Sequence, residues 1–133
     1  MASVFSKIIA GEIPSYKIAE DDEYYAFLDI QPLNLGHTLV VPKQEIDYIF
    51  DLDDANYIGL QLFAKKVAER LKKAFPDKRI GVAVIGLEVP HAHIHLIPFS
   101  KVEEMNFSNA KLHLSKEEFI AVMEKIQSAN SIS

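Results

Sequence analysis

The chain has no cysteine among its 133 residues, which excludes disulfides and metal sites built from thiolates. No stretch approaches the roughly 20 consecutive apolar residues that a membrane-spanning helix needs. Residues 1–5 lack the basic region and the long apolar run of a secretory signal. We therefore expect a cytoplasmic protein from a reducing compartment, without a membrane partner.

An excess of positive charge is also missing. The chain carries 14 Lys and Arg against 19 Asp and Glu, a formal net charge of -5. Non-specific binding of DNA or RNA depends on clustered cations that neutralise phosphates. The basic residues gather in one predicted helix, where a solvated face is the favoured interpretation: Lys65, Lys66, Arg70, Lys72 and Lys73. We expect no nucleic-acid partner.

Repeats, low-complexity tracts and long linkers are absent as well. Apolar side chains make up 49% of the residues, enough for one packed core in a chain of this size. These features predict a single domain over residues 1–133. Its core spans about residues 4–100, and a C-terminal extension follows over about 101–133.

Hydrophobic periodicity predicts both helices and strands. Short strands are expected at residues 16–19, 24–29, 37–41, 79–85 and 91–97, and a short helix at residues 3–9. A long helix is expected from about residue 53 to 75, and Pro76 ends it. Its apolar stripe has helical spacing: Leu60, Phe63, Val67, Leu71 and Phe75.

Near the C-terminus, Ser115 and Glu118 form a capping-box pattern that opens a further helix. The strands do not alternate regularly with helices. This favours an α+β fold with a mainly antiparallel sheet, one long helix and an additional C-terminal helix.

The most informative segment is residues 91–97, where histidine alternates with apolar residues. Because side chains on a strand alternate between its two faces, His91, His93 and His95 are predicted to project from one face. Ala92 and Ile94 then point into the core. Three titratable rings on one face of a buried strand indicate a functional site.

Three interpretations of the histidines compete on physical grounds. The plainest interpretation is that the three histidines are ordinary polar residues on a half-exposed strand. A metal site is the second, because alternating histidines supply two imidazole ligands and His37 or Glu88 could add a third. Nucleophilic catalysis is the third, since neutral imidazole attacks phosphorus well when neighbours fix its tautomer.

The same segment resembles the motif of the histidine-triad (HIT) superfamily, and the similarity extends beyond it. Residues 5–14, 27–32 and 36–43 are similar, in order and spacing, to other blocks of that family. The similarity covers roughly residues 4–98 and is closest to the Hint-like branch and its bacterial relatives. It implies a HIT-like fold.

The resemblance also implies roles for individual residues. His93 corresponds to the nucleophile that forms a nucleotidyl-histidine intermediate, while His91 and His95 orient it and contact the phosphate or the leaving group. His37 corresponds to a histidine that supports the triad, and Asp29 to the ribose-binding carboxylate. Positions that line the base and sugar pocket correspond to four apolar residues: Phe5, Ile8, Leu28 and Ile30. The implied chemistry needs no metal or other cofactor, and the implied assembly is a homodimer in contact through the long helix and a strand.

The chain departs from the family pattern just before the triad. Leu87 stands where a glutamine is usual, and Glu88 stands where Hint-like enzymes of higher organisms have a serine that assists the leaving group. A carboxylate near the α-phosphate repels it. The backbone N–H groups of Glu88 and Val89 remain candidate phosphate contacts. No Asn occurs between Ile80 and His91, so a polar loop common in the family is also missing.

We therefore expect a hydrolase or transferase that acts at the α-phosphate of purine nucleoside monophosphate derivatives, in the manner of a phosphoramidase. A dinucleoside polyphosphate hydrolase is one alternative. A catalytically weak nucleotide-binding protein and a zinc-binding module are two others.

Overall fold

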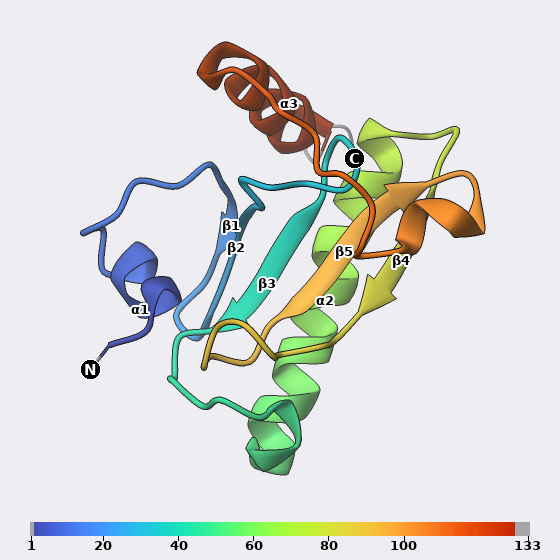
Figure 1. The fold of residues 1–133 in the computed structure, drawn as a ribbon. Coiled ribbons are helices and arrows are strands. Elements are labelled where there is room, and N and C mark those ends of the chain that lie inside the picture. Colours follow the sequence, from blue (N-terminus) through green and yellow to red (C-terminus); the bar gives the residue numbers. More distant parts are fainter. Residues whose placement is uncertain (1, 130–133) are drawn as a thin grey trace.

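The computed structural model describes residues 2–129; Met1 and residues 130–133, the ends of the predicted domain, lie outside this range. Figure 1 shows helices packed on a single sheet. The strands are β1 (Lys17–Glu20), β2 (Tyr24–Leu28), β3 (Thr38–Pro42), β4 (Arg79–Ala83) and β5 (Ile94–Phe99). The helices are α1 (Val4–Ile9), η1 (Ile49–Asp51), α2 (Asp54–Ala74), η2 (Val102–Met105) and α3 (Lys116–Ala129). All strand pairs are antiparallel in the order β1-β2-β3-β5-β4, so the predicted α+β fold is confirmed.

The helices begin where capping side chains predict. Asp53 accepts a hydrogen bond from the Asn56 N–H at the start of α2. At the start of α3, the Ser115 hydroxyl oxygen accepts from the Glu118 N–H, and the Glu118 carboxylate accepts from the Ser115 N–H. The predicted capping box is therefore present, and it fixes the start of the C-terminal helix.

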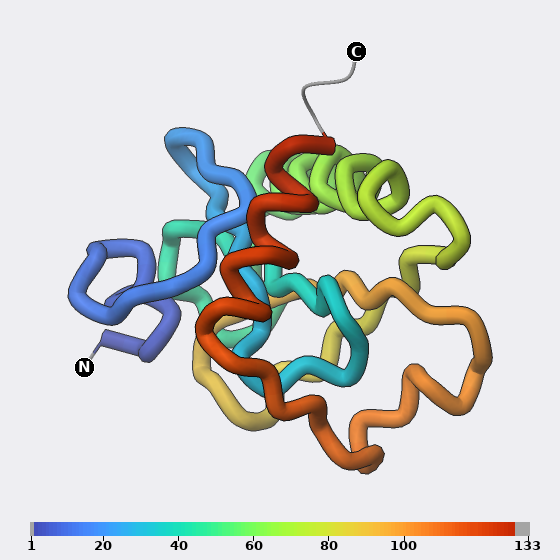
Figure 2. The backbone as a smooth tube through the Cα atoms, turned by 90° about the horizontal axis from the view of Figure 1, so that it is seen from above, coloured from blue at the N-terminus to red at the C-terminus, as the bar shows by residue number. Residues whose placement is uncertain are grey.

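The main core lies between the sheet and the two longer helices. Tyr24, Ala26 and Leu28 of β2 face this side, as does Val40 of β3. All five residues of the predicted α2 stripe are buried, as expected of an amphipathic helix that covers a sheet. Figure 2 shows the red α3 ending alongside α2, and α3 also contacts β1.

A smaller core lies on the opposite face of the sheet, beneath α1. Phe5 of α1 packs there on the alternate residues of β2 and β3, which include Phe27 and Leu39. Phe27 pairs with Leu39, and Leu39 pairs with His95, so these three residues form one row across the sheet. This face carries the histidines.

Three predicted strand boundaries differ from the structure by two residues or more. The triad strand was predicted over 91–97 but begins at Ile94 and ends at Phe99, and β4 ends at Ala83, two residues short of the predicted end. The His91 N–H bonds to the Val89 carbonyl in a tight turn, and the Ala92 N–H bonds to the Ile46 carbonyl. Both bonds take the backbone out of the β ladder before Ile94, so only His95 of the triad lies on a strand.

Within residues 2–129, no helix combines the length and the apolarity needed to cross a bilayer.

In the basic cluster of α2, Arg70 and Lys72 donate hydrogen bonds to backbone carbonyl groups of the protein itself. Arg70 donates to the Ile18 carbonyl at 2.7 Å, and Lys72 donates to the Pro76 carbonyl at 2.9 Å. Lys65 and Lys66 are exposed.

Candidate active site

The histidine face holds a cavity of about 310 Å³. Leu39 and His95 on the sheet form its floor, and the loop before β5, gold in Figure 1, forms one wall. The segment that follows η2 forms another wall. The lining residues that the site uses are Phe5, Asp29, Glu88, His93, His95, Phe107 and Lys111.

His93 lies at the centre with a defined tautomer. Its Nδ1 is 2.8 Å from the carbonyl oxygen of His91. A carbonyl only accepts, so Nδ1 carries the hydrogen and donates it. In the neutral ring Nε2 then keeps its lone pair, and the ring lines the cavity. His93 therefore offers the electron pair that a nucleophile requires.

His91 is fully buried and is bound on both sides of its ring. Its Nε2 donates to the Pro42 carbonyl at 2.7 Å, so its Nδ1 accepts from the Ser3 hydroxyl at 2.8 Å. Glu45 holds this end of α1 by accepting from the Ser3 N–H and the Ser6 hydroxyl. The family-based expectation that His91 contacts phosphate is therefore not met in this arrangement. Its ring has no free nitrogen and does not line the cavity, and His91 positions His93.

His95 is held by His37 through a second chain of hydrogen bonds. The Leu33 N–H donates to His37 Nδ1 at 3.0 Å, so the neutral His37 ring carries its hydrogen on Nε2. That Nε2 donates to His95 Nδ1 at 2.9 Å. The hydrogen of His95 then resides on Nε2, the ring nitrogen available to the cavity, where it can donate a hydrogen bond to a departing group.

Burial keeps these rings neutral. It lowers the pKa of His37 to about 3, and the neighbouring charges of His95 and Lys111 act in the same direction. Burial and the charge of His93 lower the pKa of His95 to about 4. Burial also lowers the pKa of His91. At neutral pH the neutral tautomers derived above for His37, His91 and His95 are therefore the relevant states.

Asp29 lies beside this pair at the mouth of the cavity. One carboxylate oxygen accepts from the Gln31 N–H at 2.9 Å, and the other is 3.6 Å from His37 Nε2. Because His37 is neutral, this contact is not an ion pair. Burial raises the pKa of Asp29, against the opposing effect of the bond from Gln31. The second oxygen remains an acceptor at the cavity.

Asp29, His37 and His95 could also bind a cation by residue type. Their potential ligand atoms lie within 4.8 Å of one another. A cation at His37 Nε2 would displace the hydrogen that this atom shares with His95, because Leu33 already uses Nδ1. Glu88, the other ligand proposed from the sequence, is not part of this group.

The residues predicted to bind nucleotide fall into two groups. Phe5, Asp29, Glu88 and Val89 line the cavity. Ile8 packs at the edge of the smaller core, Ile30 is 70% exposed, and neither lines the cavity. Leu28 lies in the main core on the opposite face of the sheet.

The cavity lining includes three residues that did not follow from the sequence reasoning: Leu39, Phe107 and Lys111. Leu28 was predicted to line the base and sugar pocket, but the face of the sheet beneath α1 carries Phe27 and Leu39 instead. Because side chains on a strand alternate, Asp29 on the cavity side places Phe27, not Leu28, on that side. Phe107 and Lys111 come from the C-terminal extension, where the sequence has no periodicity that predicts contact with the triad.

The loop of residues 84–93 carries the departures from the family pattern. Leu87 is 88% exposed at the cavity rim and offers no side-chain donor. Glu88 is also exposed there. The polar contacts expected on this side of an α-phosphate are therefore limited to backbone groups.

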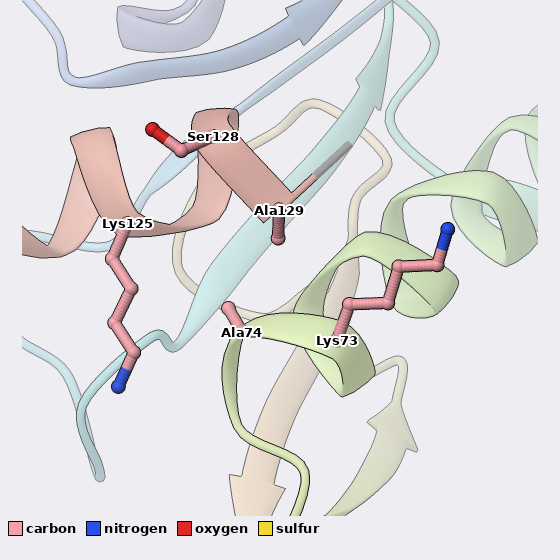
Figure 3. A pocket seen from close by; sticks show the side chains of 5 residues that line it. All are labelled: Lys73, Ala74, Lys125, Ser128 and Ala129. Atoms are coloured by element: carbon pink, nitrogen blue, oxygen red, sulfur yellow. The ribbon is translucent and has the colours of Figure 1, made fainter. Parts of the chain in front are cut away.

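A second hollow lies between the last turns of α2 and α3 (Figure 3). Its lining is Lys73, Ala74, Lys125, Ser128 and Ala129. In Figure 3 the two lysine side chains extend in different directions, away from one another. Lys125 instead lies over the Phe75 ring at 4.5 Å. Among the described residues no buried side-chain nitrogen or oxygen lacks a hydrogen-bond partner, so none is left over for a ligand here, and we do not consider this hollow a functional site.

Comparison with known proteins agrees with this geometry. The sequence model of the HIT domain matches residues 10–102. A HIT-like protein of Borreliella burgdorferi is 39% identical over 124 residues, 87% of this chain and 89% of that protein. The adenosine 5'-monophosphoramidase hnt1 of Schizosaccharomyces pombe is 33% identical over 134 residues, 96% of this chain and 98% of that protein.

The fold has close structural relatives too. The crystal structure of a HIT-like protein from Bartonella henselae superposes with a TM-score of 0.82 at 32% identity, over 96% of this chain and 95% of that one. The match of residues 10–102 includes all three triad histidines, His37 and Asp29, and it excludes Phe5 and the segment with Phe107 and Lys111. The chain thus belongs to the HIT family, and His91, His93 and His95 are its histidine triad.

Proposed function

We propose that the protein hydrolyses purine nucleoside monophosphate derivatives at the α-phosphorus, as a phosphoramidase does, through a nucleotidyl intermediate on His93. One observation carries the proposal: the His91 carbonyl holds the hydrogen of His93 on Nδ1. The lone pair of Nε2 is then available in a cavity that also contains an imidazole N–H donor and a carboxylate.

In the first displacement, His93 Nε2 attacks the α-phosphorus. The P–N bond to His93 forms as the bond from phosphorus to the leaving group breaks. The leaving nitrogen takes a proton from solvent before the bond breaks, so it departs as a neutral amine, and His95 Nε2–H donates a hydrogen bond to the lone pair that this nitrogen gains. The His93 ring becomes positively charged in the intermediate, and the Nδ1–H bond to the His91 carbonyl strengthens with that charge.

In the second displacement, water attacks the same phosphorus. The attacking water releases its proton to solvent as the P–O bond forms, and His95 keeps its hydrogen on Nε2. The bond from phosphorus to His93 breaks, and His93 regains its lone pair. The products are the nucleoside monophosphate and the group released in the first step.

The nucleotide's own contacts follow from the walls of the cavity. Asp29 offers a carboxylate oxygen to the ribose hydroxyls. Phe5, Leu39 and Val89 offer an apolar surface to the base, and they contain no side-chain hydrogen-bonding group that would select one purine. We propose that catalysis requires no metal. The nucleophile His93, the hydrogen-bond donor His95 and the groups that orient them are all side chains or backbone of this chain.

The decisive experiment is release of AMP from adenosine 5'-phosphoramidate, with and without a chelator. We expect chelator-resistant turnover by the native protein and a loss of at least about 10⁴-fold in His93→Ala. The exposed His113 supplies the matched control, since His113→Ala removes an imidazole outside the cavity and should leave turnover unchanged.

Mass spectrometry of rapidly quenched reactions provides a second measurement. A covalent adduct heavier by one nucleotidyl group should appear in the native protein and be absent in His93→Ala. If the native protein binds AMP but releases none from the phosphoramidate, the proposed activity is wrong and the triad only binds nucleotide.

We also propose that the protein is a homodimer in contact through α2 and β4. Ile58 and Leu62 of α2 are 56% and 55% exposed, and Val82 of the edge strand β4 is 61% exposed. Apolar side chains beside an edge strand are typical of a surface covered by a partner. Leu62→Glu should convert the dimer to a monomer in sedimentation equilibrium, whereas Ile30→Glu, at another exposed apolar position, should not. A monomeric native protein would contradict the proposal.

A further inference from the structure

The chain beyond the HIT-domain match returns to the active site. Residues 106–112, here called the crossover segment, follow η2 and pass the loop before β3, as Figure 2 shows in orange and red. The Leu112 N–H donates to the Pro32 carbonyl at 2.9 Å, which fixes the end of the segment beside that loop. The C-terminal extension therefore forms part of the cavity wall.

The crossover segment packs on one particular histidine. The Phe107 ring lies 4.8 Å from the His95 ring and 6.1 Å from the His37 ring, edge-on to both. On the side of α1, Phe5 lies 5.0 Å from His93. His93 and His95 are thus enclosed between an aromatic ring from α1 and one from the crossover segment.

Lys111 brings a positive charge to the same side. It is half-buried, and its ammonium group donates to the carbonyl oxygens of Phe107 and Asn109. These two bonds hold the side chain, and an ammonium group has a third hydrogen to donate. Among the described residues that line the cavity, Lys111 is the only lysine or arginine, whereas Asp29 and Glu88 are acidic.

The position of Lys111 places it near the leaving group rather than near the base. The apolar base side of the cavity, with Phe5, lies beside His93. The hydrogen-bond donor to the departing atom is His95, and the crossover segment packs on His95. A group that leaves beside His95 therefore departs along the wall that carries Lys111.

We propose that Lys111 is a specificity residue that favours leaving groups with a negative charge, a carboxylate or a phosphate, close to the bond that breaks. The inference rests on the proposed function. The charged group itself does not react: the bond from phosphorus to the leaving atom breaks, that atom leaves with a proton from solvent while His95 donates a hydrogen bond to it, and the carboxylate or phosphate stays attached to it. Lys111 pairs with that charge both before and during departure.

Two matched substrates test the inference directly. Adenosine 5'-phosphoramidates of glycine and of glycinamide differ in one charge on the leaving group. We expect the native protein to prefer the glycine compound by about five- to tenfold in kcat/KM. In Lys111→Gln that ratio should fall close to one, and in Lys111→Arg it should be largely retained. Lys116→Gln removes an exposed lysine outside the cavity and should leave the ratio unchanged.

The ratio separates a charge effect from a structural one. If Lys111 only supported the crossover segment, Lys111→Gln would slow both substrates equally and the ratio would stay the same, which would overturn the inference. A native preference for the neutral compound would overturn it too. Diadenosine polyphosphates, used in parallel, distinguish a phosphate-bearing leaving group from a carboxylate-bearing one.

Binding keeps the inference testable if the protein releases no AMP. Isothermal titration with AMP and with non-hydrolysable α,β-methylene-ADP measures the same charge preference without chemistry. Lys111→Gln should weaken the methylene-ADP complex by about fivefold more than the AMP complex. Equal weakening would refute the Lys111 assignment, whereas absent turnover alone would refute only the proposed function.

Discussion

The two neighbours of His93 in the triad are built in different ways. His91 is fully buried, with one ring nitrogen bound to Ser3 and the other to Pro42. His95 uses one ring nitrogen to accept from His37 and presents the other to the cavity. One histidine is thus occupied entirely by the protein, and the other is half available to a substrate.

This difference separates support from chemistry within a motif that looks symmetric in the sequence. The His91 flank connects α1, the end of β3 and the backbone of His93 through hydrogen bonds, so it mainly stabilises the folded state. The His95 flank contains Asp29, Phe107 and Lys111, and its tautomer is fixed by the Leu33 N–H through His37. Substitutions on the two flanks should therefore affect different properties.

The largest expected effect is on turnover at the His95 flank. His95→Ala removes the hydrogen-bond donor to the leaving group, and we expect kcat for a phosphoramidate to fall by about 10²–10³-fold. A substrate with a good leaving group that needs no such donor, such as p-nitrophenol, should lose far less. Equal losses for both substrates would mean that His95 does not act on the leaving group.

The His91 flank should respond mainly in stability. His91→Ala leaves a cavity in place of a buried ring and removes the partners of the Ser3 hydroxyl and the Pro42 carbonyl. We expect the free energy of unfolding to fall by about 2–4 kcal/mol in urea denaturation. His95→Ala, at a site open to the cavity, should cost less stability. The reverse order would contradict the division between the two flanks.

Acid should weaken the fold through the same buried rings. The pKa of His37 is about 3 and that of His95 about 4 in the folded protein, against about 6.5 in the unfolded chain. As the pH falls from 7 to 5, the unfolded chain gains protons that the folded rings do not. The free energy of unfolding should therefore fall by about 2 kcal/mol for each ring over this range, and the loss continues until the pH passes below the folded pKa, about 4 for His95 and about 3 for His37.

His37→Gln provides the control for the acid effect. Its side chain can still accept from the Leu33 N–H and donate to His95, but it does not titrate. The fall in stability between pH 7 and 5 should be smaller by about 2 kcal/mol than in the native protein. An unchanged fall would show that carboxyl groups, and not His37, are responsible.

The sequence predicted the fold well because local physics decides most of it. The α2 stripe from Leu60 to Phe75 has helical spacing, and Ser115 with Glu118 caps α3, so both helices follow from nearby residues. The α+β sheet follows from the short strands and their turns. The start of β5 was predicted three residues early, because the bonds that bend residues 91–93 away involve Ile46, Pro42 and Ser3, far away in the sequence.

The site could be predicted only where a family motif or the alternation of side chains along a strand indicates it. The triad, His37 and Asp29 followed from the family blocks. Phe27 could have been predicted to lie on the same face of the sheet as Asp29, because it is two residues from Asp29 along the chain. Phe107 and Lys111 were not, because the crossover segment has no regular structure and its position depends on the Leu112 bond to Pro32.

The smallest effect we expect is at Glu88, on the rim of the cavity where an incoming phosphate passes. Glu88→Ser removes an exposed negative charge and restores the residue of the Hint-like pattern, so kcat/KM for a phosphoramidate should rise by about two- to fivefold at low salt. Salt screens exposed charges beyond roughly 10 Å at 0.1 M, so a purely electrostatic gain shrinks as salt is added. A gain that persists in high salt would instead mean that the serine hydroxyl assists the leaving group, giving the His95 flank a second donor. Glu117→Ser, outside the cavity, should change neither value.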